Sequence, residues 1–248
     1  MEPTVWTQRV SVGFRRSLAF YEHRYDILRQ LEGQSLLRDF HVDEVGDAVS
    51  AVLRDPQHRL TLRANGLDAS VLSPDGELPR VQSAIELALS LIVPQALVQA
   101  RFRFQWLAPL TDLDYARARV VAAEGFFDKA IPKLTDFAMI GDLRSDKPAG
   151  NVRVEAGVLQ RAEIPMRLAG QGSGIAPPDP ETPPTLWPVD SLPEVAFYTQ
   201  SVWFVEGSLG GAEELSTVWG EALAGSGRLM SSLIAKARMT GKEDSRDE

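Results

Sequence analysis

The chain has 248 residues, 44% apolar side chains and a formal charge of −8, and it contains no cysteine. Its length and apolar content suffice for one large or two small globular domains. Because there is no cysteine, disulfides, thiolate catalysis and cysteine-ligated metals are excluded. No apolar run approaches the ~18 residues of a membrane span. We expect a cytoplasmic protein with no membrane partner, and its acidity disfavours non-specific binding to nucleic acid, which depends on basic residues.

The first half begins with alternating polar and apolar residues at positions 9–14, which predicts a strand with Val10, Val12 and Phe14 on its buried face. A helix follows, and Gly33 is expected to end it in a left-handed conformation. Another strand is predicted near residues 49–53. A helix from about Pro79 then carries an apolar stripe, formed by Val81, Ala84, Ile85, Ala88, Leu89 and Ile92.

Between that strand and that helix, residues 60–71 predict a β-hairpin. Asn65 and Gly66 have the residue types of a type I′ turn, in which both central residues adopt positive φ. A turn at these residues would place Ala64 opposite Leu67, Leu62 opposite Ala69 and Leu60 opposite Val71. One face of the hairpin would then be apolar and the other polar.

The second half opens at residues 101–106 with the same alternation, ninety-two positions after the first. A helix capped by Thr111 or Asp112 should follow. Strands are expected at 137–143, 152–158 and 164–168. Residues 170–194 hold seven of the sixteen prolines and predict an irregular excursion. A strand at 195–205, a helix at 212–239 and a flexible acidic tail at 241–248 complete the chain.

This order predicts two pseudo-repeats of the form β-α-β(3-4)-α, covering residues 1–97 and 98–240. The fold class is therefore α+β, with a curved, mostly antiparallel sheet that carries its helices on one face. The topology resembles the duplicated fold of TATA-binding protein and the helix-grip folds.

Several segments also resemble a sporadically distributed bacterial family of about 250 residues that has no assigned activity. They are residues 9–14, 60–62, 101–106 and 152–154, together with a strand before a final helix. This resemblance supports the predicted fold and implies no catalytic residues.

The polar positions of the predicted strands are rich in arginine, and their guanidinium groups can pair bidentately with carboxylates or phosphates. The two lead strands, at 9–14 and 101–106, are expected to meet at the pseudo-twofold and to bring their arginines together on an open polar sheet face. We therefore hypothesise a non-enzymatic binding or assembly protein that acts through this face, and whose partner is an acidic segment of another protein or a phosphate-bearing ligand. The alternative is that these arginines only pair locally, for example Arg63 with Asp68 and Arg153 with Glu155. The predicted partner-binding residues are Arg9, Arg15, Arg63, Arg101, Arg103, Arg153 and Trp187.

Trp187 lies in the proline-rich excursion, where it is either an exposed partner anchor or a side chain packed onto the body. Two other functions stay open. The concave sheet could bind nucleic acid, or a pocket beside Gly225 and Gly227 of the last helix could hold a small molecule or an enzyme substrate. The histidines lack ligand-like spacing, so no metal site is predicted. No catalytic or cofactor-binding residues are predicted either. Core positions are expected for Trp106, Trp203, Phe204 and Trp219.

Overall fold

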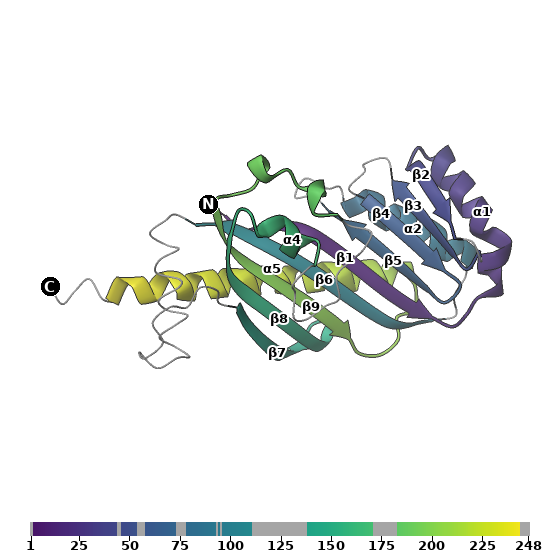
Figure 1. Ribbon diagram of the computed structural model, residues 1–248. Coiled ribbons are helices and arrows are strands. Elements are labelled where there is room, and N and C mark those ends of the chain that lie inside the picture. Colours follow the sequence, from purple (N-terminus) through teal and green to yellow (C-terminus); the bar gives the residue numbers. More distant parts are fainter. Residues whose placement is uncertain are drawn as a thin grey trace.

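Nine antiparallel strands form one sheet (Figure 1) in the computed structural model, which describes residues 2–43, 46–53, 58–72, 78–92, 94, 96–110, 138–170 and 183–243. The order across the sheet is β2-β3-β4-β5-β1-β6-β9-β8-β7. The strands are β1 (Thr4–Phe14), β2 (Leu37–Val42), β3 (Ala48–Leu53), β4 (His58–Arg63), β5 (Gly66–Val71), β6 (Leu97–Pro109), β7 (Ala138–Asp146), β8 (Ala149–Gln160) and β9 (Val195–Val205).

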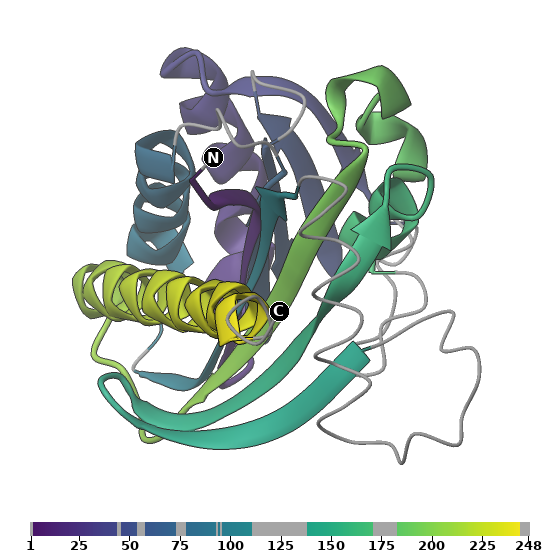
Figure 2. The same cartoon turned by 90° about the vertical axis from the view of Figure 1, so that its left-hand side faces the viewer.

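Three long helices cover one face of the sheet, which we call the helix face. They are α1 (Leu18–Gly33), α2 (Leu78–Ile92) and α5 (Ala212–Glu243). Figure 2 shows the strands curving around α5, so the helix face is the concave side there. The main core lies between these helices and the sheet. It includes Val10 and Phe102 of the strands and Trp219 of α5. The predicted stripe of α2 is buried at all six positions, as its spacing indicated.

The opposite face, which we call the second face, is covered at one end by the segment that follows β8. That segment contains the short helix α4 (Ile164–Leu168) and the 3-10 turns η1 (Pro184–Leu186) and η2 (Val189–Ser191). A second apolar cluster joins it to the sheet through Leu107, Trp187 and Tyr198. The prediction of a strand at 164–168 was wrong, because these residues form α4, in which Pro165 occupies the first turn. The long helices share one face as predicted, but α4 lies on the other.

The two lead strands, β1 and β6, pair with each other at the centre of the sheet. Val10 lies directly opposite Phe102, and these two positions differ by the ninety-two residues of the predicted repeat. The other strands of each half follow outward in reverse chain order. The helix expected from Thr111 or Asp112 lies outside the described residues, so the pseudo-repeats at 1–97 and 98–240 stay a prediction.

The hairpin of β4 and β5 has a register two residues away from the predicted one. Leu62 lies opposite Leu67 and Arg63 opposite Gly66, so the two-residue turn contains Ala64 and Asn65. Gly66 instead belongs to β5, where a Cβ would lie 2.9 Å from the carbonyl oxygen of Val12. Glycine at this position permits close approach to β1. The sequence pattern had instead indicated that this glycine belongs to a turn. A shift of two residues leaves each side chain on its predicted face.

Some helix ends and one strand differ from the sequence reading. Ser35, not Gly33, takes the left-handed conformation after α1, with φ of 57°. Strand β2 was not predicted, because it lacks clear alternation and four of its six residues are exposed. Helix α5 continues past the predicted end to Glu243, which includes the start of the predicted 241–248 tail. No helix among the described residues is long and apolar enough to cross a membrane.

Candidate anion-binding face

Arginines from the two central strands meet on the second face. Arg9 of β1 lies directly opposite Arg103 of β6, and Ser11 lies opposite Arg101. Residues opposite each other in an antiparallel pair have Cβ atoms about 5 Å apart. Arg101 donates a hydrogen bond from Nη2 to the hydroxyl oxygen of Ser11, at 3.4 Å. The sequence prediction that the lead strands bring these arginines together is confirmed by the register.

The same arginines are less exposed than an open sheet face would make them. Arg103 is only 8% exposed, while Arg9 and Arg101 are partly buried. Arg9 donates from Nη2 to the carbonyl oxygen of Leu168 at the end of α4, at 3.3 Å. The prediction of a fully open polar face was therefore wrong at this end, because the segment after β8 folds back over it. Arg101 lies two residues along β6 from Arg103, on the side away from that segment.

An aromatic side chain lies beside the arginines. Phe204 of β9 is opposite Arg101 and is 37% exposed, with Asn151 of β8 next to it across the sheet. Phe204 was predicted to lie in the core. Instead, the neighbouring Trp203 takes the inward position and Phe204 points to the second face. We call the set of Arg9, Ser11, Arg101, Arg103 and Phe204 the arginine face.

Three other predicted arginines are not part of this group. Arg63 pairs with Asp68 in the β4–β5 hairpin, as the local alternative predicted. Arg153 pairs with Asp142 rather than with Glu155, through Nε at 2.8 Å and Nη2 at 3.2 Å. That guanidinium lowers the pKa of the Asp142 carboxyl, which keeps it charged. Arg15 is exposed just past the end of β1.

Trp187 is a packed side chain and not an exposed anchor. Its indole is 3% exposed within the second apolar cluster. The indole Nε1 donates to the carbonyl oxygen of Leu72 at 3.0 Å, so its single polar group is satisfied. Of the two readings that the sequence left open, the structure shows the buried one. Trp187 therefore fixes the proline-rich segment to the sheet.

A buried polar network lies beneath α4, beside the arginine face. The amide Nε2 of Gln105 donates to Gln200 Oε1 at 2.9 Å, to the Tyr198 hydroxyl at 3.1 Å and to the carbonyl oxygen of Arg167 at 2.9 Å. Arg167 also pairs with Glu155, whose side chain is 2% exposed. Burial raises the pKa of Tyr198, so the phenol stays neutral and donates to Gln200.

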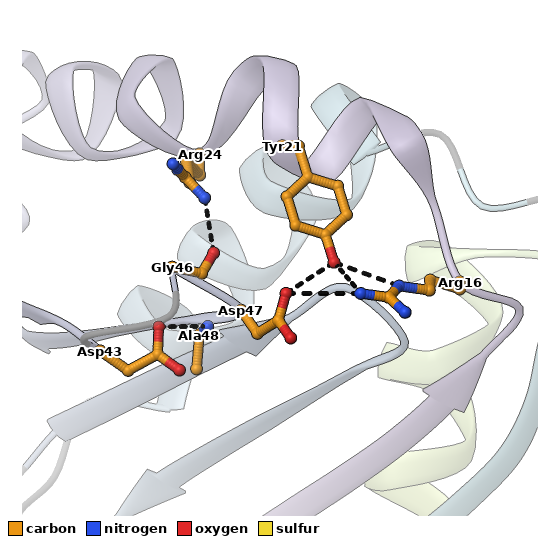
Figure 3. A network of polar contacts seen from close by, with 7 residues as sticks. All are labelled: Arg16, Tyr21, Arg24, Asp43, Gly46, Asp47 and Ala48. Atoms are coloured by element: carbon orange, nitrogen blue, oxygen red, sulfur yellow. Dashed lines mark hydrogen bonds and ion pairs between the residues drawn. The ribbon is translucent and has the colours of Figure 1, made fainter.

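A separate polar network fixes the start of α1 to the region before β3 (Figure 3). The Tyr21 hydroxyl donates to Asp47 at 2.7 Å, and Arg16 donates to both of them. Arg24 donates to the carbonyl oxygen of Gly46 at 2.5 Å. The hydrogen bond from Arg16 to Tyr21 raises the pKa of Arg16, which leaves this arginine charged. These contacts hold the start of α1 against residues 46 and 47.

The interface between the sheet and α5, where a pocket was predicted beside Gly225 and Gly227, is filled at Gly225 and borders an open pocket at Gly227. A Cβ at Gly225 would lie 2.5 Å from the ring of Trp203, and a Cβ at Gly227 would lie 3.3 Å from the ring of Trp106. The two glycines therefore make room for tryptophans. An open pocket of about 550 Å³ lies at the edge of this interface, lined by Glu2, Pro3, Trp106, Gly227, Arg228 and Ser231.

No group of three or more metal-ligating side chains occurs among the described residues. No protein-family model matches the chain, and no curated protein matches it either. The resemblance to a bacterial family therefore stays a prediction, and the functional argument rests on the geometry of the arginine face.

Two features of this region were missed by sequence reasoning, and a signal was present for only one of them. Residues 198, 200, 202 and 204 alternate with the inward residues of β9, so parity alone places Tyr198, Gln200 and Phe204 on the face of Gln105 and Arg101. The ion pair of Arg167 with Glu155 had no such signal, because it depends on the return of α4 across the sheet.

Proposed function

We propose that this protein is a non-enzymatic binding or assembly component that takes an acidic segment of a protein partner on its arginine face. The observation that carries the proposal is the register that sets Arg9 opposite Arg103 and places Arg101 beside them. Like charges directly opposite each other destabilise an antiparallel pair, so this arrangement favours an anion nearby. Guanidinium groups bind carboxylates through paired hydrogen bonds.

Arg101 is the arginine that a partner can reach most readily. It is partly exposed, it forms no ion pair with the residues that the structure describes, and its guanidinium donates a hydrogen bond to Ser11. Arg103 is nearly buried and Arg9 donates to Leu168. Arg101 and Phe204 therefore form the accessible surface of the site.

The test compares Arg101→Glu with the wild-type protein in binding a fluorescent peptide of ten glutamates at low salt. We expect the dissociation constant to rise at least about tenfold, since the accessible cation becomes an anion. The control is Arg38→Glu, an equal charge change at an exposed position of β2, the far edge of the sheet. Equal weakening by both variants, or no binding by the wild type, would contradict the proposal.

Single-stranded nucleic acid is the second candidate partner, and Phe204 is the observation that favours it. An exposed aromatic side chain beside an arginine on a sheet can stack a base, which is worth about 1–3 kcal/mol. The charge of −8 opposes this reading. Phe204→Ala separates the two partners: it should weaken binding of a thymidine decanucleotide and leave the glutamate peptide unaffected if nucleic acid is the ligand.

A further inference from the structure

Strand β7 is an edge of the sheet with an unusually regular form. Its nine residues pair with β8 without any register shift, and no strand of the described residues pairs with its other side. The opposite edge, β2, has six residues and an irregular register between Leu37 and Asp39. Short and irregular edges resist pairing with another chain, whereas a long regular edge is a template for it.

The direction of the backbone groups of β7 follows from the bonds that β8 makes to its other neighbour, β9. The carbonyl oxygen of Ala149 accepts from the N–H of Glu206, and the N–H of Arg161 donates to Glu194, so the odd-numbered residues of β8 direct their backbone groups toward β9. The even-numbered residues of β8 then face β7, where they lie opposite odd-numbered residues such as Leu143. The even-numbered residues of β7 direct their N–H and C=O groups away from the sheet.

The side chains of β7 combine exposed apolar groups with opposite charges. Ile140 is 54% exposed and Leu143 is 47% exposed. Asp142 is bound by Arg153, and Arg144 is bound by Glu206 with Nη2 to Oε2 at 2.5 Å. These hydrogen bonds lower the pKa of Asp142 and raise the pKa of Arg144, so both side chains stay charged at neutral pH.

We infer that β7 pairs antiparallel with the β7 of a second copy of this chain, about a twofold axis at Leu143. In that register Leu143 lies opposite itself, and the outward backbone groups of Asp142 and Arg144 exchange hydrogen bonds between the two copies. Since 142 + 144 equals 143 + 143, Asp142 of each copy lies opposite Arg144 of the other. The two cross-strand ion pairs and the paired Leu143 side chains make the edge self-complementary.

The charge pattern can be tested with two variants that each dimerise weakly alone but form a heterodimer when they are mixed. Asp142→Arg puts arginines opposite each other in a homodimer, and Arg144→Asp puts aspartates opposite each other. We expect each variant alone to dissociate at least about tenfold more readily than the wild type in sedimentation velocity. An equal mixture of the two should form heterodimers, because both cross-strand pairs are again opposite in charge.

The matched control is Arg63→Asp, which also breaks an exposed hairpin ion pair but lies far across the sheet, in β4. It should dimerise like the wild type. A wild-type chain that stays monomeric at concentrations on the order of 100 µM would overturn the inference. A dimer that both β7 variants retain at wild-type strength would overturn it as well.

Hydrogen exchange on the wild type tests the inference without any variant. Pairing should slow exchange of the backbone amides of Ile140, Asp142 and Arg144 as concentration rises, while the odd-numbered amides are already protected by β8. The amides of β2 serve as an internal control, since they should not respond to concentration. Dimerisation without protection at these even positions would place the interface elsewhere and overturn the inference.

Discussion

At the scale of single residues, Gly225 sets how closely α5 approaches the sheet. A Cβ at this position would lie 2.5 Å from Cη2 of the Trp203 indole, closer than carbon atoms can come. We expect Gly225→Ala to lower the free energy of unfolding by about 1–3 kcal/mol, because either the indole or the helix must shift. Urea unfolding followed by tryptophan fluorescence measures this change.

The control for this substitution lies in the same helix. Gly220 is exposed, and a Cβ there meets nothing within 4 Å. Alanine at Gly220 should raise the free energy of unfolding by roughly 0.5–1 kcal/mol, because glycine costs more backbone entropy in a helix. A Gly225→Ala variant that gains stability as Gly220→Ala does would show that Trp203 does not press on Gly225.

At the scale of elements, the return of α4 across the second face is held by a buried ion pair. Glu155 of β8 is 2% exposed and Arg167 of α4 is 16% exposed in their side chains. Arg167 also lies over the ring of Tyr198, with 5.9 Å between its Cζ and the ring centroid. Two buried charges of opposite sign depend on each other, because either one left alone in the interior is costly.

We therefore expect Arg167→Met to lower the free energy of unfolding by about 3–5 kcal/mol, since it removes the guanidinium that pairs with the buried Glu155 carboxylate. The double variant Arg167→Met with Glu155→Met should lose less, because the buried carboxylate is removed together with that guanidinium. A urea-unfolding cycle over both positions measures the coupling. Exposed Arg153→Met provides the control, and its loss should be small. Additive effects of the two substitutions would show that the pair is not coupled.

The elements differ in how far the sequence could predict them, and the reason is length. β1, β6 and α2 carry three or more alternating or helically spaced apolar residues, so their type and their buried faces were predicted. Helix α4 has five residues, too few for helical and strand periods to be told apart. Gly66 misled the hairpin register because close approach to β1 and a turn both favour glycine.

The candidate site was predictable in part for the same reason. Strand parity placed Arg9, Arg101 and Arg103 on one face, and the pairing of lead strands brought them together. Their burial was not predictable, because the proline-rich segment reads as irregular although Trp187 fixes it to Leu72. A polar face can be derived from alternation within strands, whereas its cover depends on contacts far apart in the chain.

At the scale of the whole molecule, the two predicted repeats share one core. β1 and β6 are neighbours at the centre of one sheet, and α5 of the second half packs over β1 of the first. The indole Nε1 of Trp219 donates to Gln8 at 3.3 Å, and its ring lies 6.1 Å from that of Phe102. Separating the halves would expose Val10 and Val12 and leave the long strand β1 as an open edge.

We therefore expect the fragment 1–97 to lack a cooperative unfolding transition on its own and to aggregate through β1. An equal mixture with the fragment 98–248 should restore the circular dichroism spectrum of the intact chain, because the β1–β6 pairing and the cover of α5 form again. Thermal unfolding of each fragment and of the mixture is the measurement. If the fragment 1–97 unfolds cooperatively as a soluble monomer, its own helices suffice to cover β1, and the repeats are independent folding units joined at a secondary contact.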